Sequence, residues 1–98
     1  MTYKVIVRPE AEREIQEAFD WYEERSEGLG LELLRVADAC LSIAQRNPEV
    51  YPIMHGEVRR ALLRKFPYAL FYLIREDTIV VIACFHVKRS PADWQRRA

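Results

Sequence analysis

The sequence contains few of the residues on which many functional sites depend. It has two cysteines, three glycines and two histidines in 98 residues. Cys40 and Cys84 each lie inside an apolar run, a pattern that indicates buried thiols in a reducing compartment rather than a disulfide framework. Three glycines do not form a glycine-rich phosphate loop, and two histidines do not indicate a metal centre. We therefore expect no cofactor and no metal site.

Long hydrophobic segments are also missing. The apolar run from Ile79 to Phe85 is far too short to cross a bilayer. Acidic residues begin at Glu10, and no apolar stretch of signal-peptide length precedes them. These absences predict a cytoplasmic protein without a membrane partner.

The net charge is zero, but the two halves of the chain differ strongly. Through Asp38 there are five basic residues against ten acidic ones, a balance of −5, and the remaining ten basic and five acidic residues give +5. A basic surface formed by the second half would attract a polyanion or an acidic partner. An uneven distribution that serves only solubility explains the same counts, so both interpretations stay open.

What the sequence does contain is enough apolar material for one folded domain, residues 1–98. Half of the residues are apolar and 11% are aromatic. After a short β-prone run from Tyr3 to Val7, apolar residues at helical spacing predict two consecutive helices, the first beginning at Pro9 and the second ending at Asn47-Pro48. The stripe of the second helix includes Leu33, Cys40 and Ile43. The first helix carries acids that we assign to its solvated side: Glu10, Glu14 and Glu17.

Three β-prone runs follow the helices, from Val58 to Phe66, from Tyr68 to Arg75 and from Thr78 to His86. Glu76-Asp77 joins the last two as a tight hairpin. The order βααβββ predicts an α+β fold, with a helical hairpin packed on one face of a small, mostly antiparallel sheet. The segment from Ala92 to Ala98 is expected to be a loosely docked tail.

The last two strands are apolar on both faces, which is unusual for an antiparallel sheet in a monomer. Two helices joined by a short loop cover only one face. The other face is therefore expected to be exposed and to receive an amphipathic segment of another chain. The alternatives are that the tail, with Trp94, folds back over this face, or that the sheet curves and closes on itself. Because the tail has a single large apolar residue, we favour the partner.

Basic residues gather in the second strand and at the end of the fourth. An antiparallel arrangement would bring them around one concavity that binds phosphates, where a histidine can act as general acid or base in RNA cleavage. Strand surfaces also carry such residues to prevent edge pairing, and from composition alone we favour this structural reading. The residues are Arg59, Arg60, Arg64, Lys65, His86, Lys88 and Arg89.

The second half of the chain resembles the RelE/ParE superfamily of bacterial toxins. The run from Val58 to Tyr72 reads Val-Arg-Arg-Ala-Leu-Leu-Arg-Lys-Phe-Pro-Tyr-Ala-Leu-Phe-Tyr and closely resembles one stretch of that family. The ending is also similar, with His86-Val87-Lys88-Arg89-Ser90-Pro91 and then Trp94. The opening resembles the family at Trp21-Tyr22 and around Glu14, where the family commonly has an aspartate.

The resemblance implies the toxin of a toxin-antitoxin system, associated with plasmid stabilisation and neutralised by a co-encoded antitoxin whose C-terminal segment wraps the toxin. RelE-like members are endoribonucleases that cut messenger RNA in the ribosome, whereas ParE-like members poison DNA gyrase. RelE-like cleavage uses a basic cluster and often a C-terminal tyrosine, but no tyrosine follows Tyr72, and Val87 stands where one subgroup has one. We therefore favour the ParE-like branch, which needs no nuclease site, and keep the RelE-like branch and a non-toxic partner-binding module as alternatives. Whether the protein is an enzyme stays open, since a RelE-like member would be an endoribonuclease.

Three groups of site residues follow from this reading. Catalytic candidates, for a RelE-like activity, are His86, Arg89 and Arg64. Candidates for binding gyrase or nucleic acid are Arg59, Arg60, Arg64, Lys65, Lys88 and Arg89. Candidates for binding the antitoxin are Tyr68, Leu70, Tyr72, Ile74, Val80 and Ile82.

Overall fold

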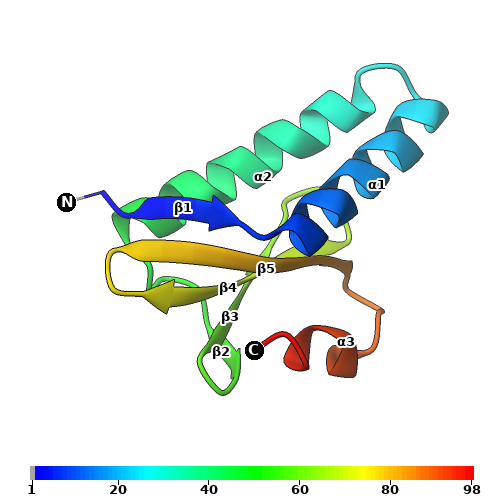
Figure 1. Ribbon diagram of the computed structural model, residues 1–98. Helices are drawn as coiled ribbons and strands as arrows, with labels where there is room; N and C mark the ends of the chain where they lie inside the picture. The colour runs from blue at the N-terminus through cyan, green and yellow to red at the C-terminus, as the bar shows by residue number, and fades with distance from the viewer. Residues whose placement is uncertain (1) are drawn as a thin grey trace.

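A computed structural model describes residues 2–98 as a five-stranded sheet with helices on both sides (Figure 1). The predicted order βααβββ is confirmed, with one further strand and one further helix. The elements are β1 (Lys4–Val7), α1 (Pro9–Arg25), α2 (Leu29–Arg46), β2 (Ile53–His55), β3 (Val58–Leu62), β4 (Tyr68–Arg75), β5 (Thr78–His86) and α3 (Pro91–Gln95). No helix in the part of the chain described here is long and apolar enough to span a membrane.

The strands lie in the order β1-β5-β4-β3-β2. β1 pairs with β5 in parallel, and all other neighbours are antiparallel. β4 and β5 have the predicted bounds, and the two-residue turn between them places Glu76 at a φ of 54°. The predicted strand from Val58 to Phe66 ends at Leu62 instead, because the chain turns through Lys65 at a φ of 70° before Pro67.

The joint between α1 and α2 is closed by a carboxylate. Gly28 precedes α2 at a φ of 88°, a left-handed conformation that favours glycine. Glu23 accepts hydrogen bonds from the backbone N–H groups of Gly28 and Gly30, each at 2.9 Å. These contacts satisfy two N–H groups at the start of α2 that have no partner within the helix.

The main core lies between the helical hairpin and the sheet. It includes Ala11 and Leu33 from the helices and Leu70, Tyr72 and Ile79 from the sheet, all fully or almost fully buried. The Tyr72 hydroxyl donates a hydrogen bond of 2.6 Å to the carbonyl of Pro48, so this buried polar group is satisfied.

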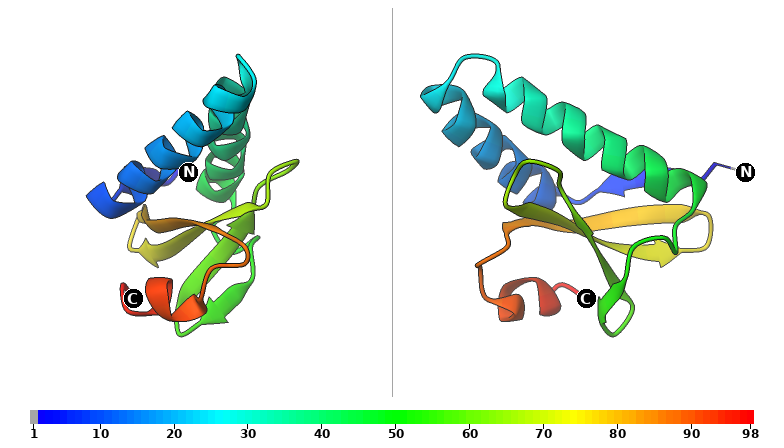
Figure 2. Two further views of the ribbon diagram at one scale, coloured as in Figure 1. Left: turned by 90° about the vertical axis from the view of Figure 1, so that its right-hand side faces the viewer. Right: turned by 180° about the vertical axis from the view of Figure 1, so that it is seen from behind.

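A second core fills the opposite face of the sheet. Figure 2 shows α3 on the side of the sheet away from the helical hairpin. Trp94 of α3 is only 6% exposed and stacks on Phe71 at a centroid distance of 4.6 Å. Phe85 and Ile82 belong to the same cluster. The expectations of a bare second face and a loosely docked tail are therefore wrong, because one large aromatic ring covers the small patch that the two strands form.

Candidate functional site

The predicted basic concavity is not formed as one site, because the sheet distributes its residues to separate places. Arg59 points toward the helical side, where its guanidinium donates to the carbonyls of Tyr51 at 2.7 Å and Glu49 at 3.1 Å. It holds the loop before β2 and is largely buried. Arg59 thus has a structural role.

Arg60, His86 and Arg89 come together on the opposite face. They line a small cleft of about 90 Å³ between the sheet and α3, together with Phe85 and Trp94. The Nε atom of Arg60 is buried there and has no hydrogen-bond partner among residues 2–98. Of the predicted basic residues, these three are the ones that the structure unites.

The contacts of His86 and Arg89 hold the turn that follows β5. The Nδ1 atom of His86 accepts the backbone N–H of Lys88 at 3.1 Å, and the ring packs edge-on against Tyr68. Since Nδ1 is an acceptor, the proton of the neutral imidazole is assigned to Nε2. Arg89 pairs with Asp93 at 2.9 Å and lies over the ring of Phe85. Lys88 is exposed beside them.

Arg64 and Lys65 lie elsewhere, on the loop between β3 and β4, where Lys65 pairs with Glu32 of α2 at 3.2 Å. They border a groove between α2 and the outer edge of β3, with a volume of about 650 Å³. We call it the α2–β3 groove. Its lining residues are Glu32, Arg35, Val36, Ala39, Cys40, Ile43, Tyr51, Leu62, Arg64 and Lys65.

The residues proposed to bind the antitoxin divide between the two cores. Tyr68, Leu70, Tyr72 and Ile74 face the helical hairpin, where Leu70 and Tyr72 are fully buried. Val80 and Ile82 face α3, and Ile82 is fully buried. None of the six forms an exposed apolar surface in this structure, because each lies in a core that the chain itself closes.

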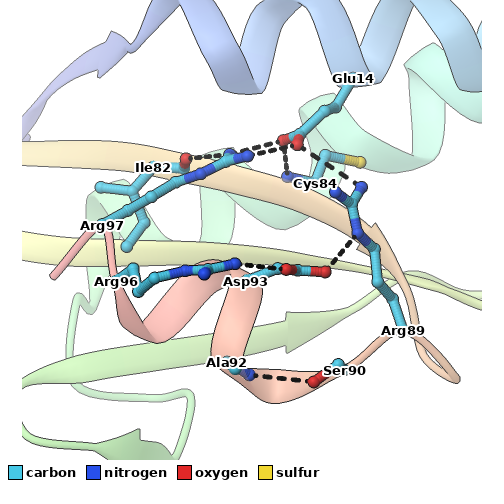
Figure 3. Close-up of polar contacts among 9 residues, drawn as sticks. All are labelled: Glu14, Ile82, Cys84, Arg89, Ser90, Ala92, Asp93, Arg96 and Arg97. Atoms are coloured by element: carbon cyan, nitrogen blue, oxygen red, sulfur yellow. Dashed lines mark hydrogen bonds and ion pairs between the residues drawn. The ribbon is translucent and has the colours of Figure 1, made fainter.

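A buried ion cluster joins the first helix to the C-terminal segment (Figure 3). Glu14 is 7% exposed and accepts a bidentate pair of hydrogen bonds from Arg97, at 2.9 and 2.8 Å. It also accepts the backbone N–H of Cys84 at 3.0 Å, and Arg89 lies 3.8 Å away. Arg97 donates in addition to the carbonyl of Ile82. The assignment of Glu14 to the solvated side of the first helix is therefore wrong.

The cluster changes the acidity of its members. The hydrogen bond to Glu14 raises the pKa of Arg97. The hydrogen bond from Arg89 is the main cause that lowers the pKa of Asp93, a half-buried carboxyl of α3. Burial, followed by the nearby negative charge of Glu14, raises the pKa of the Cys84 thiol to about 12. Cys84 is thus an inert, neutral thiol at neutral pH.

Two features of the sequence indicate this cluster, although the polarity of Glu14 alone suggests an exposed position. Glu14 follows Ala11 by three residues and precedes Ala18 by four, so helical spacing puts it between two buried positions. Ser90-Pro91 is typical of a helix start, and the Ser90 hydroxyl does accept the N–H of Ala92. Together they indicate a C-terminal helix near α1.

Solved structures of similar fold come from toxin-antitoxin systems. The chromosomal ParDE system of P. aeruginosa matches with a TM-score of 0.72 at 13% identity, over 87% of this chain and 96% of that one. The RelBE2 toxin-antitoxin complex of Mycobacterium tuberculosis gives 0.63 at 18%, over 88% and 99%. A free-state mutant of the E. coli toxin RelE gives 0.66 at 16%, over 99% and 98%. At these identities the matches show the fold alone.

Sequence comparison is more specific about the branch. No curated protein sequence matches the chain significantly. A sequence model described as "ParE toxin of type II toxin-antitoxin system, parDE" matches residues 5–91, from β1 to the first residue of α3. This span includes the helical hairpin, all five strands and Glu14 of the ion cluster. The chain therefore belongs to the ParE toxin family of type II toxin-antitoxin systems.

Proposed function

We propose that this toxin acts in the cytoplasm by inhibiting DNA gyrase and is neutralised by a co-encoded antitoxin. The observation that carries the proposal is the ParE match over residues 5–91. ParE-like toxins poison gyrase through a protein surface and need no nuclease site. The known structures of similar fold include toxin-antitoxin assemblies, which supports an antitoxin as the partner.

The side-chain geometry favours gyrase over messenger RNA. RNA cleavage needs an accessible general base and a cluster of free cations around the scissile phosphate. Here Arg59 is bonded to two carbonyls, and Arg89 is engaged by Asp93 and Phe85. Arg64 and Lys65 border the α2–β3 groove, away from His86. Arg60, His86 and Arg89 share the small cleft beside α3, but the other basic residues that a RelE-like mechanism would use lie in separate places.

The direct test is a supercoiling assay with purified toxin. Gyrase is incubated with relaxed plasmid, ATP and increasing amounts of the chain, and we expect supercoiling to be lost. In parallel, a translating extract is supplied with a defined transcript, which we expect to stay intact. Full supercoiling together with cut transcripts would contradict the proposal and favour the RelE-like alternative.

A growth assay separates toxicity from mere partner binding. Expression of the chain without its antitoxin is expected to stop growth, and expression of a non-toxic binding module would not. The His86→Ala variant, which removes the one histidine beside Arg60 and Arg89, is expected to stop growth as well as the original chain does. Loss of toxicity in this variant, with its fold intact by circular dichroism, would point to a catalytic histidine.

A further inference from the structure

We propose that a pocket between α1 and the ends of β4 and β5 receives an arginine or lysine side chain of DNA gyrase. We call it the α1–β5 pocket. The inference rests on the proposed gyrase inhibition and adds which part of the toxin surface meets the enzyme and by what chemistry. The pocket has a volume of about 230 Å³. Sites for drug-sized molecules have roughly 300 to 1,000 Å³, so a single long side chain fits this pocket better.

The wall that α1 contributes is formed by residues at helical spacing. Glu14, Glu17, Ala18 and Trp21 lie along one side of this helix and line the pocket. Ala18 is 2% exposed, whereas the much larger Trp21 is 46% exposed. A tryptophan left half in water beside a pocket is typical of a residue that a partner protein covers.

Two aromatic rings offer faces on which a cation can lie. Trp21 comes from α1, and Tyr68, the first residue of β4, is half-buried in the lining. Arg25 occupies one face of the indole, with its guanidinium carbon 3.2 Å from the ring centre, and does not line the pocket. An incoming cation therefore has the opposite face of Trp21 and the ring of Tyr68.

The unmatched charge of the pocket is negative. Two carboxylates and one guanidinium line it, those of Glu14, Glu17 and Arg89. Glu14 is matched by Arg97, and Arg89 by Asp93. Glu17 is exposed and forms no ion pair within residues 2–98. The pocket therefore favours a basic side chain over an acidic or a neutral one.

Glu17 and Tyr68 act on each other electrostatically. Burial is the main cause that raises the pKa of Tyr68, and the negative charge of Glu17 is among the smaller causes. The phenol is thus neutral at neutral pH, and the carboxylate acts on the same space. A cation placed there is attracted both by the ring and by the carboxylate.

Gyrase offers the matching chemistry. An enzyme that holds DNA carries arginine and lysine where its surface meets the phosphates. A guanidinium is planar and weakly hydrated, so it can stack on an aromatic ring and pair with a carboxylate at the same time. A basic side chain of gyrase can therefore use both features of the pocket.

The test measures the concentration of the full toxin chain that halves supercoiling by gyrase. Glu17→Lys reverses the unmatched charge and is expected to raise this concentration by roughly tenfold or more. Glu24→Lys is the matched control, because Glu24 is an exposed glutamate of the same helix that does not line the pocket. It is expected to inhibit as strongly as the original chain. Equal inhibition by the two variants, with both folded by circular dichroism, would overturn the inference.

Two substitutions of Trp21 distinguish a cation from an apolar group as the occupant. Trp21→Phe keeps an aromatic face, and Trp21→Leu keeps apolar bulk without one. We expect Trp21→Leu to inhibit clearly more weakly than Trp21→Phe, because a cation is attracted by the face of a ring. Equal inhibition would mean that no cation enters the pocket. If these variants do not fold, the exposed Glu17 position still decides the question.

Binding of the co-encoded antitoxin separates the two partners. Glu17→Lys is expected to bind the antitoxin as the original chain does, and weakened binding would overturn the assignment of the pocket to gyrase. If the original chain leaves supercoiling intact, the proposed function fails and the inference fails with it. If the original chain inhibits gyrase and Glu17→Lys inhibits equally, only the inference fails.

Discussion

At the scale of single residues, Glu14 has the most consequential position in this molecule. A carboxylate buried on a helix is costly unless its charge and its acceptor sites are matched. Arg97 supplies two hydrogen bonds, and the backbone N–H of Cys84 supplies another. One side chain thus joins α1, β5 and the segment after α3.

Replacing this carboxylate should destabilise the fold strongly. Glu14→Ala leaves the guanidinium of Arg97 uncompensated in a partly buried site, and we expect the free energy of unfolding to fall by about 3 to 5 kcal/mol. Urea denaturation followed by circular dichroism measures the change. Glu24→Ala, on an exposed position of the same helix, should stay within about 0.5 kcal/mol of the original chain. Equal effects of the two variants would contradict the role assigned to Glu14.

The buried thiol of Cys84 predicts a loss of stability at high pH. Its pKa is raised from 9.0 to about 12 in the folded chain, so the unfolded chain loses this proton first. The thiol's contribution is therefore fully present below pH 9 and is lost as the pH rises toward 12, at a slope on the order of 1 kcal/mol per pH unit.

The measurement compares urea denaturation of the original chain and of Cys84→Ala at about pH 8 and pH 10. Tyrosines such as Tyr51, whose pKa is also raised to about 12, titrate in both proteins and cancel in the comparison. We expect the variant to lose less stability between the two pH values. Identical losses would show that Cys84 is not protected from ionisation.

At the scale of elements, the short helix α3 depends on contacts outside itself. A helix of five residues is not stable alone. It is held by the stacking of Trp94 on Phe71, by Arg97 on Glu14, and by the Arg8 guanidinium, which donates to the carbonyl of Arg97 at 3.1 Å. The position of α3 thus depends on contacts with the sheet and with α1.

Two adjacent arginines test this attachment. Arg97→Ala removes both hydrogen bonds to Glu14 and is expected to cost about 2 to 4 kcal/mol, to loosen α3 and to increase binding of a hydrophobic dye. Arg96 is 75% exposed in its side chain and, within residues 2–98, pairs only with Asp93, so Arg96→Ala should leave stability and dye binding nearly unchanged. Dye fluorescence and urea midpoints are measured on both variants. Dye binding by both, or by neither, would mean that the pair with Glu14 does not secure α3.

Some boundaries of the helices and strands could be predicted from sequence patterns, and others could not. Pro9 marks the start of α1, and α2 ends at Arg46, directly before Asn47-Pro48, as the patterns predict. β2 could not be found this way, since Ile53–His55 is a three-residue edge strand whose residues are all exposed and lie in a segment rich in proline. Its existence depends on β3 alongside it.

At the scale of the whole molecule, the sheet has a core on each side. The apolar character of both faces of β4 and β5 was readable in the sequence, but the identity of the cover was not. A single tryptophan seemed too little, yet Phe71, Phe85 and Trp94 fill the second core with large rings. The candidate basic site failed for a related reason, because strand alternation and the β3–β4 loop send neighbouring arginines to different surfaces.

The parallel pairing of β1 with β5 sets when this protein can complete its fold during synthesis. β5 lies between β1 and β4, although it is the last of the five strands to be translated. Until β5 leaves the ribosome, β1 has no partner strand and Glu14 lacks the amide of Cys84. A nascent chain therefore cannot complete the centre of its sheet until most of it has been translated.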